Sequence, residues 1–590
     1  MLQGCVDAGV RLMVLCPGSR SGPLAVAAGW IERKGVELVT AIDERSAAFF
    51  ALGHGRATGL PAAVITTSGT AVANLLPAAV ESDYGAIPLL LLTADRPARL
   101  QGCGANQTVN QEAFLRPSLR WQGLADPAGL HRMDPGALRQ LAADALRACL
   151  GQGGQAPGPV QLNLPLEEPL HGNAAVLRGL GEALPPPVQP GGLAAEPCER
   201  RRHDPGEVAL LEPLNPDQPG LIVAGPWRGR PQHQPGFLRA LHQLQRRTGW
   251  PLLADALSGL RGTAELELVA GYDLLLAAPR SDLQARQVLR LGPVPASRRL
   301  QSFLRSCGGH QLLISEGEPR SLDALRCATA QFDGGLEAWW GGVAAPWGAA
   351  TPALEAQALA RRWLGADRGL QAWLDQWLDQ QFCGPTGPAA GGLSEPALTR
   401  RLSRLLPAGL PLVLANSSPV RDWESFMPPD APPRAVVSFR GASGIDGTLS
   451  LACGVAQADG AAVLITGDLA LLHDANGWLW RRQLHGRLTV LLLDNGGGGI
   501  FEQLPIRPDP ERLLDFDRLF AMPQAVDPLA LAAAHGVPGR SCADLAALEV
   551  DLAWALAQPL ALLRLPTDRR ADAGLRQALR TMGAALQSWP

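Results

Sequence analysis

The sequence predicts an α/β protein of three consecutive domains, each a doubly wound parallel sheet. Three observations lead to this expectation. Continuous apolar strands such as IPLLLLT from Ile87 alternate with helical segments, which is typical of parallel sheets covered on both faces. The chain has 590 residues, more than a single hydrophobic core usually holds. Stretches rich in Pro and Gly divide it into three such alternating parts.

The first domain is expected over residues 1–172. Its predicted strands are RLMVLC, VELVTAI, AAVIT, IPLLLLT and VQLNLP, and AVANLLPAAVESD is a predicted helix. Ligands of doubly wound folds bind outside the carboxyl ends of the strands. The polar residues that follow these strands are therefore candidates for a site, and they include Ser19, Arg20, Glu44 and Arg96.

The middle domain is expected over residues 173–390 and the third over residues 391–590. A Pro- and Gly-rich linker is predicted from about residue 180, and a second linker with one helix inside it over residues 341–392. The predicted strands are GLIVAGP, PLLADALSGL, YDLLLAA and HQLLIS in the middle domain, and LVLAN, AVVSF, AAVLITG, LTVLLLD and LALLRLP in the third.

Composition excludes several classes of protein. A net charge of −3 and a pI near 6.4 give no basic surface for nucleic acid. The ten cysteines include no CxxC pair, so we expect reduced thiols rather than disulfides or a zinc site. No apolar run reaches the roughly 20 residues of a membrane span. The first residues carry Asp7 and Arg11 inside their apolar stretch and no basic leader, so a cytoplasmic location is expected.

The lysine content restricts how phosphate can be held. Lys34 is the one lysine of the chain. A P-loop needs Gly-Lys-Ser/Thr and pyridoxal phosphate needs an aldimine lysine. Lys34 lies in the polar stretch ERKG and fits neither requirement. A phosphate group must therefore be bound in another way.

The third domain offers such a way at two strand ends. Asp468 follows the predicted strand AAVLITG, and Asn495 follows LTVLLLD and precedes four consecutive glycines. Mg²⁺ prefers oxygen ligands, which Asp468, Asn495 and the carbonyl of Gly497 can supply. The glycines would let the backbone approach a diphosphate closely. Alternatively, Asp468 caps a helix and the glycines form a tight turn, but the coincidence of both features favours a metal–diphosphate site.

Glu44 also has two interpretations. An acid in the first turn of a helix is favourable to the helix dipole, which would explain a lone Glu. The apolar residues Ala47, Ala48 and Phe49 that follow would instead favour a protonated carboxyl that shares its proton with a heteroaromatic nitrogen.

Motifs along the whole chain point to one family. The first domain carries CPGSRSGPL at Cys16, DERSAAFFALG at Asp43, TTSGTAVANLLPAAVE at Thr66, TADRP at Thr93 and GANQTVNQ at Gly104. The third carries NSSPVRD at Asn416, RGASGIDG at Arg440, GDLALLHDANG at Gly467 and DNGGGGIF at Asp494. With these motifs the chain resembles thiamine-diphosphate enzymes of the pyruvate-oxidase type. It most resembles their MenD-type 2-succinyl-5-enolpyruvyl-6-hydroxy-3-cyclohexene-1-carboxylate (SEPHCHC) synthase family, which has GDL where most of the superfamily has GDG.

The resemblance implies roles for the cofactor residues. Glu44 would hydrogen-bond the pyrimidine N1′ of thiamine diphosphate and promote its imino tautomer. Asp468, Asn495 and the Gly497 carbonyl would hold Mg²⁺ or Mn²⁺ on the diphosphate. The remaining implied cofactor contacts are Ser417 at the diphosphate, Ile445 as the apolar wedge that bends the cofactor, and Ile500 and Phe501 as pocket walls.

The resemblance also implies the reaction. 2-Oxoglutarate would be decarboxylated and the succinyl carbanion equivalent added to isochorismate, in menaquinone or phylloquinone biosynthesis. Both substrates are dicarboxylates, and guanidinium groups bind carboxylates in a bidentate manner. The implied substrate contacts are Ser19, Arg20, Arg96, Asn106, Gln107, Arg298, Arg421 and Arg440, with Arg299 beside Arg298 equally explained as a surface charge.

The family resemblance further implies a homodimer or a dimer of dimers. Two other interpretations stay open at this point. One is a different thiamine-diphosphate 2-oxo-acid synthase or decarboxylase. The other is a catalytically silent paralogue that keeps the fold as a binding or regulatory subunit.

Overall fold

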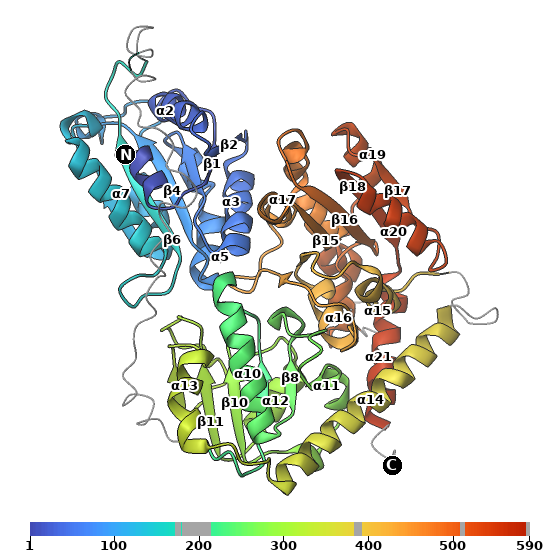
Figure 1. Cartoon of the computed structure of the whole chain (residues 1–590). Helices are drawn as coiled ribbons and strands as arrows, with labels where there is room; N and C mark the ends of the chain where they lie inside the picture. Colours follow the sequence, from blue (N-terminus) through green and yellow to red (C-terminus); the bar gives the residue numbers. More distant parts are fainter. Residues whose placement is uncertain (172–178, 180–213, 383–391, 508–513, 586–590) are drawn as a thin grey trace. The chain divides into compact units, whose positions relative to one another are not determined.

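The protein is described by a computed structural model that covers residues 1–171, 179, 214–382, 392–507 and 514–585 (Figure 1). The predicted domain boundaries after residues 172 and 390, and the predicted linker from residue 180, lie outside these described residues. The described chain forms three six-stranded sheets, and every strand pair within them is parallel. The predicted α/β class with three parallel sheets is therefore confirmed.

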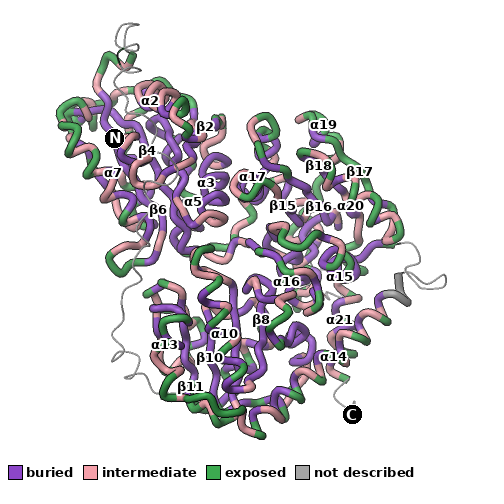
Figure 2. The backbone as a smooth tube through the Cα atoms, viewed as in Figure 1, coloured by how far each residue is buried: buried purple, intermediate pink, exposed green. Residues whose placement is uncertain are grey.

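The first sheet has the strand order β2-β1-β3-β4-β6-β5. Alternate residues of its strands, such as Met13 and Ile65, join a core beneath α1, α2 and α7, whereas helix α3 packs beside β1. The inner strands β3, β4 and β6 are buried along their length (Figure 2), whereas β2 and β5 at the two edges of the sheet are partly exposed. The strands are β1 (Leu12–Leu15), β2 (Glu37–Thr40), β3 (Ala63–Thr66), β4 (Leu89–Asp95), β5 (Trp121–Leu124) and β6 (Pro159–Pro165).

The middle sheet has the order β12-β11-β10-β7-β8-β9, the arrangement of a Rossmann-type sheet. Ile222 faces a core that includes Leu241 of α10, and its neighbour Val223 faces a second core that includes Leu304 of α12. Both faces are thus covered by helices. The strands are β7 (Leu221–Ala224), β8 (Leu252–Ala254), β9 (Leu268–Val269), β10 (Gln287–Leu291), β11 (His310–Ile314) and β12 (Ala330–Phe332).

The third sheet repeats the connectivity of the first, with the order β14-β13-β15-β16-β18-β17. One face packs against Leu398 of α15, Trp423 of α16 and Leu552 of α20. The strands are β13 (Leu412–Leu414), β14 (Val436–Val437), β15 (Ala461–Gly467), β16 (Arg487–Asp494), β17 (Gly539–Ser541) and β18 (Leu560–Pro566).

The helices lie between these strands along the chain (Figure 1). None of the described helices is long and apolar enough to cross a membrane. They are α1 (Leu2–Asp7), α2 (Gly22–Glu32), α3 (Glu44–Thr58), α4 (Thr70–Ala73), α5 (Leu76–Gly85), α6 (Gln111–Leu115), α7 (Pro135–Cys149), α10 (Gln234–Thr248), α11 (Tyr272–Leu275), α12 (Arg298–Ser306), α13 (Leu336–Trp347), α14 (Leu354–Phe382), α15 (Glu395–Leu405), α16 (Ser418–Phe426), α17 (Thr448–Asp459), α18 (Asp468–His473), α19 (Pro528–Ala534), α20 (Leu548–Ala557) and α21 (Arg569–Ala585), with the 3₁₀ segments η7 (Ala475–Arg482) and η8 (Gly499–Gln503).

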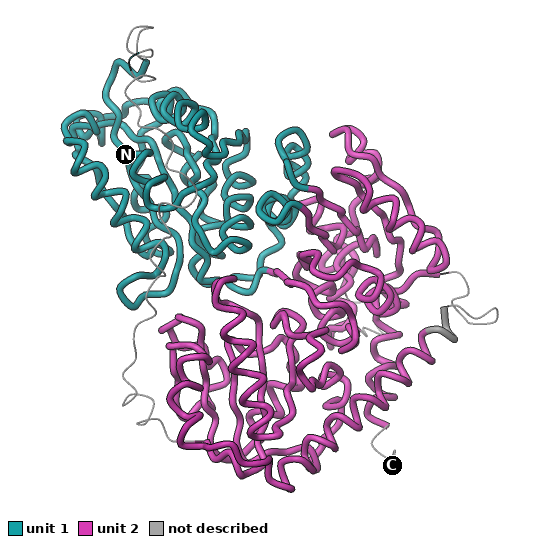
Figure 3. Tube along the Cα trace, in the orientation of Figure 1, with its two compact units in different colours: residues 1–201, 439–460, 474–486 teal, residues 202–438, 461–473, 487–590 magenta. Residues whose placement is uncertain are grey.

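The chain divides into two compact units (Figure 3). Unit 1 joins residues 1–201 to residues 439–460 and 474–486, so two segments of the third predicted domain pack with the first sheet. Unit 2 contains residues 202–438, 461–473 and 487–590, and therefore holds both the middle and the third sheet.

One prediction about the middle domain is wrong, and another is confirmed in part. YDLLLAA was predicted as a strand, but Tyr272–Leu275 forms helix α11, because a short apolar run suits a buried helix as well as a strand. The linker predicted over residues 341–392 contains a helix, as expected, but its described part is mostly helical, namely the end of α13 and the 29-residue α14. Its buried Leu359, Trp363, Leu370 and Leu374 recur at helical spacing, a period that the Ala- and Pro-rich composition obscured.

Helices α3 and α17 of unit 1 cross with their backbones in direct contact. A Cβ atom at Gly53 would lie 2.1 Å from the Leu451 carbonyl oxygen, and one at Gly454 would lie 2.0 Å from that of Phe50. Only glycine permits this approach. His54 of α3 is buried at the same crossing, 8% exposed, and burial lowers its pKa to about 4.

We expect His54 to make unit 1 sensitive to acid. Between about pH 4 and 6.5 the unfolded chain binds a proton at His54 that the folded chain does not, so the free energy of unfolding falls as the pH is lowered through this window. The full loss amounts to about 3 kcal/mol. Calorimetric melting of His54→Gln should show a flatter acid limb than wild type. The variant His131→Gln, at an exposed position of unit 1, should keep the wild-type limb, and identical limbs in all three proteins would refute the role of His54.

Candidate active site

The first sheet reverses its winding direction between β1 and β3, and the loops after these strands touch. A Cβ atom at Gly18 would lie 2.2 Å from the Cβ of Thr67. Crevices of this kind, beyond the carboxyl ends of strands, are where doubly wound sheets bind ligands. The loop after β1 places Ser19 at the surface and buries Arg20.

Two predicted substrate arginines are brought together here. Arg20 Nη1 donates to the Leu166 carbonyl at 2.9 Å, and Arg96 Nη1 donates to the Gln107 carbonyl at 2.8 Å and to Ser68. Burial lowers the pKa of Arg96, and the positive charge of Arg20 lowers it further. Arg20 also forms an ion pair with the exposed carboxylate of Glu168 at 3.2 Å, which offsets part of this positive charge. A carboxylate ligand that contacts both guanidinium groups would still be electrostatically favourable.

Asn106 and Gln107, two of the predicted polar substrate contacts, lie on the loop between β4 and α6. Gln107 adopts a left-handed backbone with φ of 56°, and its Nε2 donates to the Ser68 carbonyl at 2.8 Å. The loop is therefore fixed against the end of β3 by this bond and against the end of β4 by the Arg96 guanidinium. Asn106 and Gln107 are both exposed on it.

Glu44 is the first residue of α3 and is half-buried. Its neighbour Asp43 caps the helix by accepting hydrogen bonds from the backbone N–H groups of Arg45 and Ser46. The capping role is therefore filled without Glu44. A cavity of about 370 Å³ adjoins this helix start, lined by Asp43, Ser46 and residues of η7 such as Trp480. The structure thus keeps room beside the Glu44 turn.

Arg440 and Ile445 lie on one loop of unit 1. The sequence did not show which residue holds this loop in place. The buried carboxylate of Glu81 accepts hydrogen bonds from the N–H groups of Gly441, Ala442 and Ser443 at 2.8, 2.7 and 3.0 Å. This carboxylate fixes the loop, with Arg440 half-buried and Ile445 36% exposed. Glu81 is 360 positions from its partners, so no local motif pointed to it.

Ser417 and Arg421 lie where the third sheet reverses its direction, between β13 and β15. Ser417 precedes α16 with a φ of 76°, a conformation that costs a non-glycine residue about 1–3 kcal/mol and clusters at functional sites. Arg421 is exposed one turn along α16 and donates to the Ser417 carbonyl at 2.7 Å.

Asp468 and the glycine-rich loop meet at the same edge, as predicted from the sequence. Strands β15 and β16 are neighbours, and Asp468 Oδ2 accepts the Gly497 N–H at 2.6 Å. The other oxygen accepts the N–H of Leu469 at 2.8 Å. Burial raises the pKa of Asp468 to about 6, although both backbone donors oppose the shift. Asp468 is the first residue of helix α18, as the alternative interpretation expected, but its side chain also accepts a hydrogen bond from the glycine-rich loop after β16.

Asn495 has one amide atom satisfied and the other not. Its Nδ2 donates to Glu395 Oε1 at 2.6 Å. Among the residues that the structure describes, its buried Oδ1 has no hydrogen-bond partner. Gly497 has a φ of 123°, and a Cβ there would lie 2.4 Å from the Ala521 carbonyl oxygen. Glycine is therefore required at position 497 by close backbone packing.

These observations fit a divalent cation. A buried amide oxygen without a donor, a desolvated carboxylate and a loop of bare backbone are the groups that Mg²⁺ takes from protein alongside phosphate oxygens. The Gly497 carbonyl is less free, because it accepts the Gly499 N–H at 2.8 Å.

The residues after the glycines leave one side of this edge apolar. Ile500 is half-buried and Phe501 is 37% exposed, in η8. Arg569 of α21 donates to the Gly496 carbonyl at 2.7 Å and to Glu502 at 2.8 Å, so the loop is held from its far end. Sequence reasoning did not identify Arg569.

Arg298 is not brought to the other predicted residues by any contact that the described structure contains. It is exposed at the start of α12. Its neighbour Arg299 donates to Asp273 Oδ2 at 2.7 Å, which gives Arg299 a structural ion pair.

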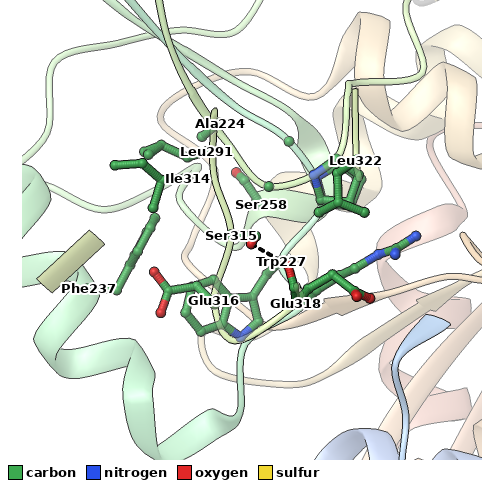
Figure 4. Close-up of a pocket in the computed structure, with 15 residues that line it drawn as sticks. Ala224, Trp227, Phe237, Ser258, Leu291, Ile314, Ser315, Glu316, Glu318 and Leu322 are labelled. Atoms are coloured by element: carbon green, nitrogen blue, oxygen red, sulfur yellow. Dashed lines mark hydrogen bonds between the residues drawn. The ribbon is translucent and has the colours of Figure 1, made fainter. Parts of the chain in front are cut away.

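The middle sheet has a pocket of its own at the carboxyl ends of β7, β10 and β11 (Figure 4). Trp227 and Phe237 form apolar walls, and Glu316 and Glu318 lie at its edge. None of the predicted site residues lines this pocket.

Comparison with known proteins accounts for all three sheets. Models of the N-terminal binding domain, the middle domain and the C-terminal binding domain of thiamine pyrophosphate enzymes match residues 1–114, 216–408 and 421–563. These matches define the chain as a thiamine-pyrophosphate-dependent enzyme.

Full-length relatives narrow the class. A protein of Synechococcus sp. (strain RCC307) is 56% identical over 98% of this chain and 96% of its own length. One of Parasynechococcus marenigrum (strain WH8102) is 52% identical over 96% and 98%, and one of Prochlorococcus marinus (strain MIT 9313) is 49% identical over 97% of both. Each is named 2-succinyl-5-enolpyruvyl-6-hydroxy-3-cyclohexene-1-carboxylate synthase. The chain belongs to this synthase family.

Proposed function

We propose that the chain decarboxylates 2-oxoglutarate and adds the resulting succinyl carbanion equivalent to isochorismate, which forms SEPHCHC for menaquinone or phylloquinone biosynthesis. The observation that carries the proposal is the near full-length similarity to relatives that bear the synthase name. The buried Asn495 Oδ1, unpaired among the described residues, supports the cation of the proposed cofactor, because it belongs to the loop whose Gly497 N–H donates to Asp468. Purified protein with thiamine diphosphate and Mg²⁺ should consume isochorismate absorbance and release CO₂ only when both substrates are present. Release of CO₂ without isochorismate consumption would instead indicate a decarboxylase.

The cofactor residues have distinct tasks in this proposal. Thiamine diphosphate, when bound, supplies an electron sink for the decarboxylation. Asp468, Asn495 and the Gly497 carbonyl would hold Mg²⁺ or Mn²⁺ against the diphosphate. Support comes from the shared edge on which these groups lie. The remaining contacts would be Ser417 at the diphosphate, Ile445 as the wedge beneath the cofactor, and Ile500 and Phe501 along its pocket.

Glu44 would exchange a proton with the cofactor pyrimidine. Because Asp43 already caps α3, the Glu44 carboxyl is available for chemistry. The Glu44→Gln variant should bind thiamine diphosphate but lose about 10²–10⁴-fold in turnover, the usual contribution of a positioned acid–base group. Hydrogen–deuterium exchange at the cofactor C2 position reports the step directly. The exposed Glu32→Gln variant should behave as wild type, and unchanged C2 exchange in Glu44→Gln would contradict the role.

The arginines would neutralise the substrate carboxylates. Arg20 and Arg96 form one cationic cluster, whereas Arg421 and Arg440 lie on other loops. Ser19, Asn106 and Gln107 would add polar contacts near the cluster. Arg298 would contribute from the middle domain, although its exposed position gives this assignment the least support.

Arg421 and Arg440 give the sharpest test, because they are less buried than Arg20 and Arg96. A hydrogen bond to a charged group contributes about 1.5–3 kcal/mol, so each Ala variant should lose roughly 10–100-fold in kcat/KM. Lys should restore only part of the loss. Thiamine diphosphate affinity should stay unchanged, and the exposed Arg401→Ala variant of α15 should have no effect. Wild-type kinetics in both variants would leave the substrate assignment without its main physical support.

We also propose that the functional assembly is a homodimer or a dimer of dimers, in which the pyrimidine and diphosphate ends of the cofactor meet different subunits. The inactive Glu44→Gln and Asp468→Ala variants, mixed under conditions where subunits exchange, should then recover part of the activity. Each variant incubated alone in the same way is the control. Absence of recovery after verified exchange would argue against a shared site.

A cytoplasmic location is proposed on the same basis. The buried thiols of Cys5, Cys16, Cys307, Cys453 and Cys542 are not joined in disulfides, which suits a reducing compartment. Cell fractionation should recover the protein with the soluble fraction, and recovery with washed membranes would contradict the proposal.

A further inference from the structure

A buried cluster of charged side chains lies directly behind Asn495. Glu395, the first residue of α15, is 1% exposed and accepts the Asn495 amide through Oε1. Its other oxygen, Oε2, accepts from Arg576 of α21. Arg576 Nε also donates to Asp422 of α16 at 2.8 Å. Three helices of unit 2 thus supply one connected network that ends at a predicted metal ligand.

The same network is closed on its far side. Asp572 of α21, 1% exposed, accepts the backbone N–H of Glu395 at 3.2 Å. One turn of α21 therefore holds both ends of the Glu395 residue: Asp572 its backbone and Arg576 its carboxylate. Ser394 caps the same helix by accepting the Ala397 N–H. Glu395 is consequently fixed in position as well as in orientation.

We propose that Glu395 and Arg576 are positioning residues for the metal site, which set the orientation of the Asn495 amide. A carboxylate only accepts hydrogen bonds. One carboxylate oxygen of Glu395 accepts from Arg576, so the other is left to accept a hydrogen bond from Asn495. Only the Nδ2 group of the Asn495 amide can donate this bond. The amide oxygen is then directed away from the cluster, where it is buried without a partner among the described residues. This inference rests on the proposed function, because it concerns the cation of that site.

A purely structural ion cluster would have different consequences. Breaking a buried charge pair destabilises the fold wherever the pair lies. The orientation of one amide matters only to a group that binds its oxygen. Residues that hold metal ligands typically contribute about 10–100-fold to metal affinity. Cation affinity therefore separates the two roles, whereas thermal stability does not.

The test is the Mg²⁺ affinity of full-length Glu395→Gln, measured by calorimetry at saturating thiamine diphosphate. A Gln side chain cannot accept from both Arg576 and Asn495, because one of its two terminal groups is a donor. We expect the Mg²⁺ Kd to rise about 10–100-fold. The kcat at saturating Mg²⁺ should return towards the wild-type value, because the chemistry itself is untouched.

A matched control comes from the middle domain. The buried Arg290 and the half-buried Asp323 form an ion pair with a 2.6 Å contact, far from Asn495 in the sequence and joined to it by no described contact. Asp323→Asn should lower the melting temperature while leaving the Mg²⁺ Kd unchanged. A rise in Kd equal to that of Glu395→Gln would reduce the effect to general destabilisation and overturn the proposal.

A double variant tests the donor–acceptor logic itself. In Glu395→Gln combined with Asn495→Asp, the new amide can donate to the new carboxylate and still accept from Arg576. The Mg²⁺ Kd should then be closer to wild type than that of Glu395→Gln alone. A double variant that binds Mg²⁺ more weakly than both single variants would contradict the proposal. Should Glu395→Gln not fold by circular dichroism, Arg576→Lys carries the same measurement, with a weaker Mg²⁺ Kd expected and an unchanged one excluding the role.

Asp468→Ala distinguishes the two levels of the argument. If Asp468→Ala loses Mg²⁺-dependent cofactor binding while Glu395→Gln binds as wild type, the positioning role is wrong and the proposed site stands. If the wild-type protein itself shows no Mg²⁺-dependent binding of thiamine diphosphate, the proposed function fails and the positioning role with it.

Discussion

The parallel direction of every strand is the constraint on which the rest of the molecule depends. Two parallel strands need a crossover connection that brings the chain back to the end of the sheet where the first strand began. The carboxyl ends of all strands, and the loops that follow them, therefore lie at the same end of the sheet. Where the winding direction reverses, the loops that follow two neighbouring strands lie side by side at the carboxyl ends of the strands. In the third sheet this happens between β13 and β15, which carry Ser417 and Asp468. In the first sheet it happens between β1 and β3, and Arg20 lies there.

The strand-end residues could be predicted from the sequence because their signal is local. Asp468 and Asn495 each follow a continuous apolar strand, and the structure joins their loops through a single hydrogen bond. Strand β10 was missed for a related reason. Its sequence QVLRL includes a buried Arg290, which reads as polar until its partner Asp323 is known. Local patterns identify strands whose neighbours are apolar, and they fail where burial depends on a distant partner.

The candidate site was predictable only in part for the same reason. Glu395 looks like an acid favourable to a helix start, and Arg576 like a cation on the polar face of an amphipathic helix. Their positions, 181 residues apart, give no pattern that joins them to each other or to Asn495. The role of Glu81 could not be predicted from the sequence either, because its three partners are backbone N–H groups, which any residue type can supply. Sequence reasoning proposed groups for contact with ligands, a prediction that stays open, and it missed the groups that hold those residues in place.

Burial of this many charges requires a cation with several directed donors, and the composition supplies it. Arg261, 2% exposed, donates to five acceptors, among them the carbonyl oxygens of Ala254, Met427 and Ala270. An ammonium group has three donors and no planar fork, so it could not satisfy such a set. The near absence of lysine therefore accords with a molecule in which guanidinium groups join its helices and loops from within.

The place of α21 in the chain has a consequence for biosynthesis. This helix supplies Arg576 behind Asn495 and Arg569 to the Gly496 carbonyl, yet it follows both strands of that edge in the sequence. On the ribosome, where segments emerge in order, β15, β16 and the glycine loop leave the exit tunnel before their supports. The nascent third sheet can thus pair β15 and β16 early, but Arg569 and Arg576 reach the ends of these strands only after α21 has been translated. The cation proposed for this site would then bind late, after the ribosome has completed α21.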